Sequence, residues 1–160
     1  MKVRCAVLLV SLLFGPAQSQ PPTLSEEQIA ARKVVTLTNG VRAKQGLPPL
    51  QPLAALNTAA LGHSQEMLDL DYFSHTSPTP GRADVSDRIE AAGGTWRACA
   101  ENIYMSSGKP LEGSAQAAVD GWVDSPGHYR NIIDPTYTHI GVGIAYRKGT
   151  LYATQVFSKP

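Results

Sequence analysis

Two histidines and a glutamate, each in its own short motif, are the residues of this chain best suited to chemistry. His75 ends the motif Phe73–His75, Glu101 begins the motif Glu101–Ile103, and His128 ends the motif Ser125–His128. Imidazole and carboxylate groups from separate segments can form one cleft that binds a metal ion or transfers protons. We therefore expect a single site built from three distant parts of the chain.

A divalent cation, zinc in the first place, suits two neutral imidazoles with a carboxylate nearby. In this interpretation His75 and His128 are the metal ligands, water fills the open positions, and Glu101 orients a histidine or holds a bound water. Each histidine also has a structural alternative, because His75 can cap a turn and His128 can pack beside Pro126 and Tyr129. Neither a His-Glu-x-x-His zinc motif nor a Gly-x-Ser-x-Gly nucleophile motif is present.

Three other reactive residues have simpler explanations. His63 and Glu66 lie three positions apart on an expected helix and could offer two ligands, but a second histidine one turn away is missing. We interpret His63 as a structural or surface residue. His139 begins an expected strand and is also interpreted as structural. Cys99 lies between two alanines, which favours a small buried hydrophobic residue over a nucleophile.

The first residues have the pattern of a secretory signal peptide. A positively charged start is followed by the apolar run Ala6–Phe14, and small residues stand at Ala17 and Ser19. We expect residues 1–19 to be this signal peptide, with cleavage after Ser19. The apolar run is too short to span a bilayer, and no longer one follows, so we expect a secreted protein, extracellular or periplasmic, without stable membrane insertion.

The chain that follows the signal peptide is expected to form one domain. Residues 20–30 are a leader and the start of the first helix, and residues 31–158 are the domain. The 141 residues after Ser19 carry 12 basic and 13 acidic side chains and one cysteine. This balance gives no basic surface for nucleic acid. One cysteine excludes an intramolecular disulfide, so we expect a monomer that is stabilised by its hydrophobic core.

Periodicity and capping residues predict helices first and strands later, which is typical of an α+β fold with helices flanking an antiparallel sheet. Asn39 and Arg42, near the end of the first helix, are expected to face solvent, and Pro126 is expected to interrupt the chain before His128. The expected elements are a helix from Ser25 to about Gln45, a helix over 50–70, a short helix capped by Ser86, a strand over 96–105, a helix over 114–123, and a hairpin of strands 139–147 and 151–158.

From Asn39 to Phe157 the sequence resembles the CAP superfamily of cysteine-rich secretory proteins, antigen 5 and pathogenesis-related 1 proteins. It is most similar to the short bacterial branch with an SCP-like extracellular domain. The motifs that carry the resemblance are Asn39–Arg42, Gly46–Leu50, His63–Met67, Tyr72–His75, Asp87–Ile89, Glu101–Ile103, Trp122–Ile132 and His139–Gly143.

This resemblance implies an α-β-α sandwich with a shallow cleft that carries two histidines and two acidic residues. His75, Glu101 and His128 match three of these four. The second acid would stand three residues after Trp122, where this chain has Ser125. Asp124 is adjacent, but on a helix it is turned away by about 100°. The expected ligand-binding cleft therefore comprises Glu101, Asn102, Asp124 and Ser125 beside the two histidines.

Three functions follow from this cleft. The first is a binding module that uses a divalent metal such as zinc and takes a small apolar ligand such as a sterol or a fatty acid, or an extracellular protein. The second is a metal-assisted hydrolase of the peptidase type, with Glu101 as general base. The third is an interaction protein with a vestigial cleft. Because no complete catalytic motif is present, the sequence favours binding.

Overall fold

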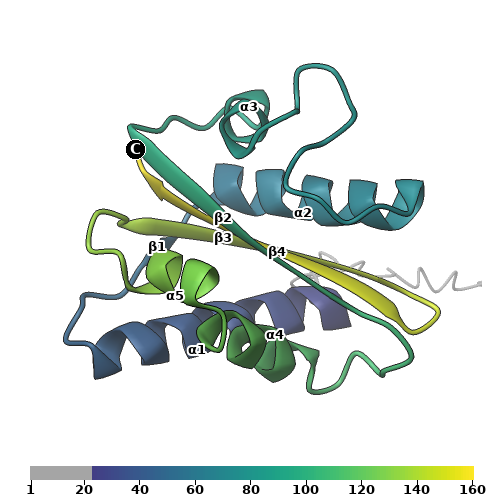
Figure 1. Ribbon diagram of the computed structural model, residues 1–160, viewed down its shortest axis with the longest axis horizontal. Coiled ribbons are helices and arrows are strands. Elements are labelled where there is room, and N and C mark those ends of the chain that lie inside the picture. Colours follow the sequence, from purple (N-terminus) through teal and green to yellow (C-terminus); the bar gives the residue numbers. More distant parts are fainter. Residues whose placement is uncertain (1–22) are drawn as a thin grey trace, which may run out of the picture.

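The computed structural model describes residues 23–160, and the predicted signal peptide lies outside them (Figure 1). No helix among the described residues is long and apolar enough to cross a membrane. The elements in chain order are α1 (Glu26–Lys44), β1 (Gln51–Pro52), α2 (Ala54–Leu70), α3 (Val85–Ala91), β2 (Ala98–Ser106), α4 (Ser114–Val123), α5 (Pro126–Ile133), β3 (His139–Arg147) and β4 (Thr150–Lys159).

The sheet has the strand order β1-β3-β4-β2. Strands β3 and β2 both pair with β4 in antiparallel fashion, as predicted. The short strand β1 instead pairs in parallel with β3, where Gln51 lies opposite His139 and Pro52 opposite Ile140. The sheet is therefore mixed, because β1, a strand of two residues that was not predicted, lies at its edge.

Helices cover both faces of this sheet, as predicted. Figure 1 shows α2 and α3 on one face and α1, α4 and α5 on the other. The core between the sheet and α1, α4 and α5 includes Trp122, whose indole N–H donates a 2.9 Å hydrogen bond to the carbonyl oxygen of Ile103. On the opposite face, Leu56 and Met67 of α2 are fully buried. The α-β-α sandwich is thus built from two apolar layers that share one sheet.

The contact between α2 and β3 is unusually close because two glycines replace side chains on that face of β3. A Cβ atom at Gly141 would overlap the backbone of α2 at Leu56, and one at Gly143 would overlap it at Leu61. The hydroxyl oxygen of Ser64 lies 3.0 Å from the carbonyl oxygen of Gly143. The helix therefore packs directly on the backbone of the strand.

Three predicted element boundaries are wrong. The second helix begins at Ala54 and not at residue 50, because Gln51 and Pro52 form β1. The residue that caps α3 is Asp84, not Ser86, and its backbone N–H donates to Oδ2 of Asp87 at 3.3 Å. Pro126 does not simply interrupt the chain but begins α5, with Ser125 as the N-cap. A proline suits this position because the first turn of a helix does not need its N–H and the fixed φ is already helical.

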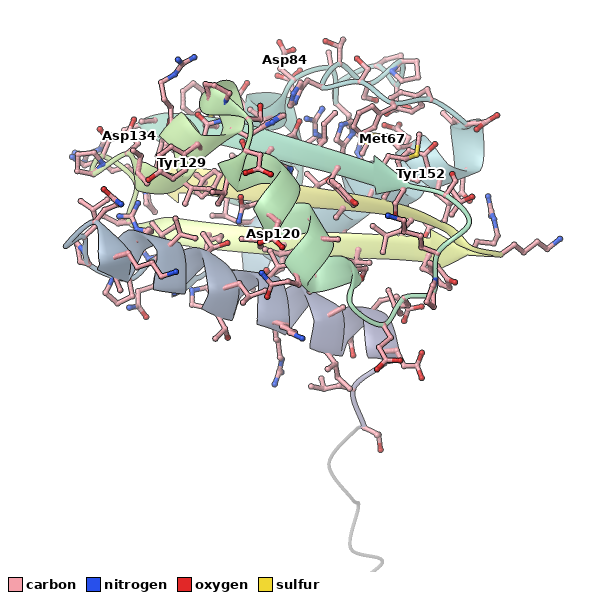
Figure 2. All side chains as sticks on the ribbon, turned by 60° about the horizontal axis from the view of Figure 1, so that its bottom comes forward. Met67, Asp84, Asp120, Tyr129, Asp134 and Tyr152 are labelled. Atoms are coloured by element: carbon pink, nitrogen blue, oxygen red, sulfur yellow. The ribbon has the colours of Figure 1, made fainter. Side chains whose placement is uncertain are left out.

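The prediction that Asn39 and Arg42 face solvent is also wrong. Arg42 is fully buried, and its guanidinium donates to the backbone oxygens of Ile132 at 2.8 Å and Asp134 at 2.9 Å. Asp134 follows α5, beside the C-terminal end of α1 (Figure 2). Burial lowers the pKa of Arg42, and Asp134 opposes that shift. The half-buried Asn39 accepts from the backbone N–H of Leu50 at 2.8 Å.

Substituting Gly143 by alanine tests the close packing of α2 on β3. We expect Gly143→Ala to lower the free energy of unfolding by about 3 kcal/mol or more, because the new Cβ forces the helix away from the strand. Urea denaturation measures the change. Gly40→Ala is the matched control, because Gly40 lies in α1 with open space around it, and alanine there should raise stability by about 0.5–1 kcal/mol. Equal stability of the two variants would contradict the packing described above.

Candidate functional site

Glu101 on β2 is the centre of the candidate site. Its carboxylate is almost fully buried, with 3% of the side chain exposed. Oε1 accepts a hydrogen bond from Nδ1 of His75 at 2.9 Å, and Oε2 accepts from Nη2 of Arg88 at 2.7 Å. Both carboxylate oxygens are therefore engaged by cationic or potentially cationic partners, as a buried charge requires.

Arg88 is the residue of this site that sequence reasoning missed. Its side chain lies on α3 and is 4% exposed. Besides Glu101, its guanidinium donates to the backbone oxygens of Ala83 at 2.9 Å and His75 at 3.1 Å. It thereby ties the loop between α2 and α3 to the sheet. The only available signal was its place beside the buried Ile89 on a short helix, in one of the motifs of the family resemblance.

The structure brings His75 and His128 together. Their ring centroids are 6.4 Å apart, with an angle of 39° between the ring planes. His75 lies in the loop after α2 and its side chain is 54% exposed. Nδ1 of His128 lies 2.9 Å from Oγ of Ser125, the N-cap of α5. Because Glu101 and Ser125 engage the two Nδ1 atoms, both Nε2 atoms are without a protein partner among residues 23–160.

A network of side-chain amides supports the backbone of His128. Nδ2 of Asn102 donates to the carbonyl oxygen of His128 at 3.1 Å and to Oε1 of Gln155 at 3.0 Å. Asn131 on α5 in turn donates to Oδ1 of Asn102 at 2.8 Å. Burial lowers the pKa of His128, and the nearby His75 lowers it further, so the imidazole of His128 is neutral at pH 7. A neutral imidazole is the form that binds a metal.

The expected cleft residues occupy three different kinds of position. Glu101 and Ser125 contact the histidines directly. Asn102 is fully buried and supports the backbone of His128. Asp124 is exposed at the end of α4, and within the described part of the chain it makes no hydrogen bond or ion pair with either histidine. The structure therefore leaves Asp124 outside the cluster.

His63 has the structural role that the sequence suggested, and it is not a surface residue. It is 1% exposed on α2, and its Nε2 lies 2.9 Å from the carbonyl oxygen of Ser74. Nε2 is also 3.8 Å from Oε1 of Glu101. Burial lowers the pKa of His63, so a neutral ring with the proton on Nε2 donates to Ser74. This hydrogen bond fixes the backbone immediately before His75.

Glu66, one turn further along α2, anchors the same loop. Its Oε2 accepts a 2.6 Å hydrogen bond from the hydroxyl of Tyr72, and its Oε1 accepts one from the hydroxyl of Thr79. Burial alone would raise the pKa of Glu66, but the hydroxyls of Ser77, Thr79 and Tyr72 outweigh it and lower the pKa to about 2. Burial and the contact with Glu66 raise the pKa of Tyr72 to about 12.

Two further candidates lie outside this cluster. Nδ1 of His139, at the start of β3, lies 2.9 Å from Oγ1 of Thr138, in keeping with a structural role. Cys99 is half-buried against the apolar residues around Leu56 and Ile89. Burial raises the pKa of its thiol, and Glu101 raises it further, so Cys99 has the properties of a packing residue and not those of a nucleophile.

Few side chains of the site can act as metal ligands. Among residues 23–160, no group of three or more histidine, cysteine, aspartate or glutamate side chains is arranged to hold a metal ion. The two free Nε2 atoms of His75 and His128 are the available nitrogen ligands. A divalent cation here would be held by two imidazoles, with water or a ligand completing the coordination.

Comparison with known sequences finds one family model and two relatives that match most of this chain. The family model of the cysteine-rich secretory proteins, abbreviated CAP, matches residues 35–157. An uncharacterized protein of Bacillus subtilis, YkwD, is 40% identical over 128 residues, which cover 80% of this chain and 47% of that protein. An uncharacterized membrane protein of the same organism, YlbC, is 33% identical over 146 residues, 88% of this chain and 39% of that protein. The chain thus spans less than half the length of these relatives.

Comparison with solved structures supports the same fold. An extracellular protein of Bacillus anthracis that contains an SCP domain has a TM-score of 0.71 and 32% identity, over 89% of this chain and 45% of that one. An outer surface protein of Borrelia burgdorferi has a TM-score of 0.68 at 18% identity, over 82% of this chain and 93% of that one. The second likeness shows the fold alone.

Neutralising Glu66 tests its role as a loop anchor through the pH dependence of stability. The folded pKa lies below the ordinary value of 4.5, so the stabilising contribution is complete above that value and is lost as the pH falls from about 5 toward 2. We expect Glu66→Gln to cost on the order of 2 kcal/mol at pH 7 and to flatten this acid slope. Urea denaturation from pH 7 to pH 2 measures both. Glu112→Gln, at an exposed position, is the control and should leave the slope unchanged.

A double-mutant cycle tests the buried ion pair between Arg88 and Glu101. Arg88→Met leaves the carboxylate of Glu101 buried without its guanidinium partner, and we expect a loss of about 3 kcal/mol or more. Adding Glu101→Gln removes the unpaired charge and should recover part of that loss. Chemical denaturation of the four proteins gives the coupling energy, and strictly additive losses would show that the two side chains do not depend on each other.

Proposed function

Because the chain belongs to the cysteine-rich secretory protein (CAP) family, we propose that it is a secreted binding module whose shallow cleft holds a divalent cation, zinc in the first place, between His75 and His128. The observation that supports this most is the pair of neighbouring imidazoles with free Nε2 atoms. The predicted signal peptide and the extracellular SCP-domain protein of Bacillus anthracis support secretion.

The two imidazoles fit a cation with little rearrangement. Two histidines on one tetrahedral zinc have ring centroids roughly 5 Å apart, against 6.4 Å here, so a small rotation of the exposed His75 side chain would suffice. Glu101 accepts from Nδ1–H of His75, which leaves a lone pair on Nε2. Carboxylate partners of this kind commonly fix the tautomer of metal-binding histidines. Ser125 can do the same for His128 by accepting from Nδ1–H.

A cation held by only two protein ligands binds weakly and keeps open coordination positions. These positions would accept an oxygen of the ligand. Suitable ligands are a small apolar molecule with a polar head, such as the carboxylate of a fatty acid or the hydroxyl of a sterol, or a side chain of an extracellular protein. The cation would thus serve as the polar anchor of the cleft.

The geometry favours binding over hydrolysis. A general base needs a carboxylate oxygen within reach of the attacking water. Both oxygens of Glu101 already accept hydrogen bonds, from His75 and Arg88, and the side chain is almost fully buried. Glu101 is therefore better suited to positioning His75 than to removing a proton from water, which weakens the case for a metal-assisted hydrolase.

Calorimetric titration of zinc into the metal-free protein at pH 7 tests the proposal. We expect one-site binding in the wild type and at least a tenfold loss of affinity in His75→Ala and in His128→Ala, because each variant leaves a single imidazole. Lowering the pH to 5 should also weaken binding, since protons then compete for the imidazoles.

His139→Ala is the matched control, because His139 lies at the start of β3 and not in the cleft. It should bind zinc as the wild type does. An absence of binding in the wild type, or equal binding in all four proteins, would overturn the metal proposal. Binding of a fatty acid or a partner protein would then have to be explained without a cation.

A further inference from the structure

The outer edge of β3 is unpaired along the second half of the strand. In the antiparallel pairing with β4, alternate residues of β3 turn their backbone groups away from β4. At the start of the strand β1 uses this outer edge, where the N–H of Leu53 donates to the oxygen of Ile140 at 3.0 Å. Further along, the N–H of Val142 donates to Oδ1 of Asn57. Within the described part of the chain, the outer backbone groups of Ile144 and Tyr146 have no partner.

A groove of about 840 Å³ runs along this open edge. Its floor is the segment Val142–Tyr146, and its two walls are α1 and α2, which cover opposite faces of the sheet (Figure 1). The wall from α1 is mixed: the apolar Ala31 and Val35 lie among polar residues, and Leu24 extends the wall just before the helix. The polar residues of this wall are Glu27, Gln28, Arg32 and Thr36. The wall from α2 is mixed. Its lining residues are Asn57, Thr58, Leu61 and Gln65.

We propose that this groove binds an extended peptide segment of a partner protein, which adds to the sheet as a strand beside β3. Strand β1 shows that the edge pairs with a strand, but it leaves after two residues because the chain turns into α2. The groove floor of five residues, 142–146, spans about 13 Å between its end residues, the length of a short strand, and only the outer N–H of Val142 already has a partner, Oδ1 of Asn57. Both faces of the added strand would be covered, one by α1 and the other by α2.

The unpaired backbone groups favour a peptide over a lipid chain as the occupant. An acyl chain in the groove would leave the outer N–H and carbonyl groups of Ile144, which have no protein partner among residues 23–160, without hydrogen bonds, and this is costly. A peptide backbone supplies both a donor and an acceptor at the same place. The edge also carries no proline or charged residue over 142–146, the devices by which proteins usually protect an edge strand.

The walls indicate which side chains the peptide should carry. Successive residues of a strand point to opposite faces, so one set would lie against Ala31 and Val35 on the wall from α1 and the other against Asn57 and Thr58 on the wall from α2. A capped hexapeptide of alternating valine and threonine matches this pattern. We expect it to bind the protein and to slow hydrogen exchange of the Ile144 and Tyr146 amides about tenfold or more, measured by NMR on the ¹⁵N-labelled protein.

Two exposed leucines of α2 provide a matched pair of variants. Leu61 lines the groove and is 46% exposed, whereas Leu70 lies outside it and is 57% exposed. Leu61→Glu should weaken binding of the hexapeptide about tenfold or more, because a charge would be buried against the added strand, and Leu70→Glu should leave it unchanged. Thermal unfolding of both variants verifies that each is folded.

Three results would overturn the proposal. The first is no binding of the hexapeptide at millimolar concentration, which the wild-type protein alone can show. The second is binding without slower exchange at Ile144, or equal binding by the Leu61→Glu variant, since either places the peptide elsewhere. The third is protection of the Ile144 region by dodecanoate and not by the hexapeptide, which would identify a lipid as the occupant. None of these results depends on zinc binding at the cleft.

Discussion

The close approach of α2 to β3 sets the positions of the features that matter most in this domain. The two glycines on β3 leave no side chain between helix and strand, so α2 rests on the backbone itself. From this fixed position α2 carries His63 and Glu66, which hold the loop before and after His75. The same helix forms one wall of the groove beside β3. A shift of α2 by the width of a methyl group would therefore disturb the cleft and the groove together.

The candidate site combines a buried ion pair with a half-exposed histidine. Arg88 and Glu101 lie beneath the surface and neutralise each other, and His75 rests on this pair with half of its side chain in solvent. His128 lies on α5, next to His75. Its Nδ1 contacts Oγ of Ser125, the N-cap of this helix, and Asn102 donates to its carbonyl oxygen. Buried partners that hold the two histidines, together with Nε2 atoms that have no protein partner among residues 23–160, suit a site that binds a ligand with little rearrangement.

The parts of this fold that could be predicted from sequence are those in which local pattern and final environment agree. The hairpin of β3 and β4 follows from alternating apolar residues and a two-residue turn, and the ends of α1 from its capping box and glycine. The burial of Arg42 could not be predicted this way, because the backbone oxygens of Ile132 and Asp134 that its guanidinium binds lie about ninety positions further along the chain. Strand β1 was missed because its two residues were assigned to the start of the second helix. Helix α5 was missed because Pro126 was interpreted as a break, although it begins the helix. That His75 and His128 bind metal remains a prediction.

The hydrogen bonds of Arg42 have a consequence for the order of folding. They join the end of the first helix to the end of α5 and the segment before β3, so the guanidinium finds its acceptors only after about four-fifths of the chain is present. Until then this cation stays in water, because burying it without partners would be unfavourable. We therefore expect α1 to complete its docking late in folding, after α5 and the segment before β3 are in place.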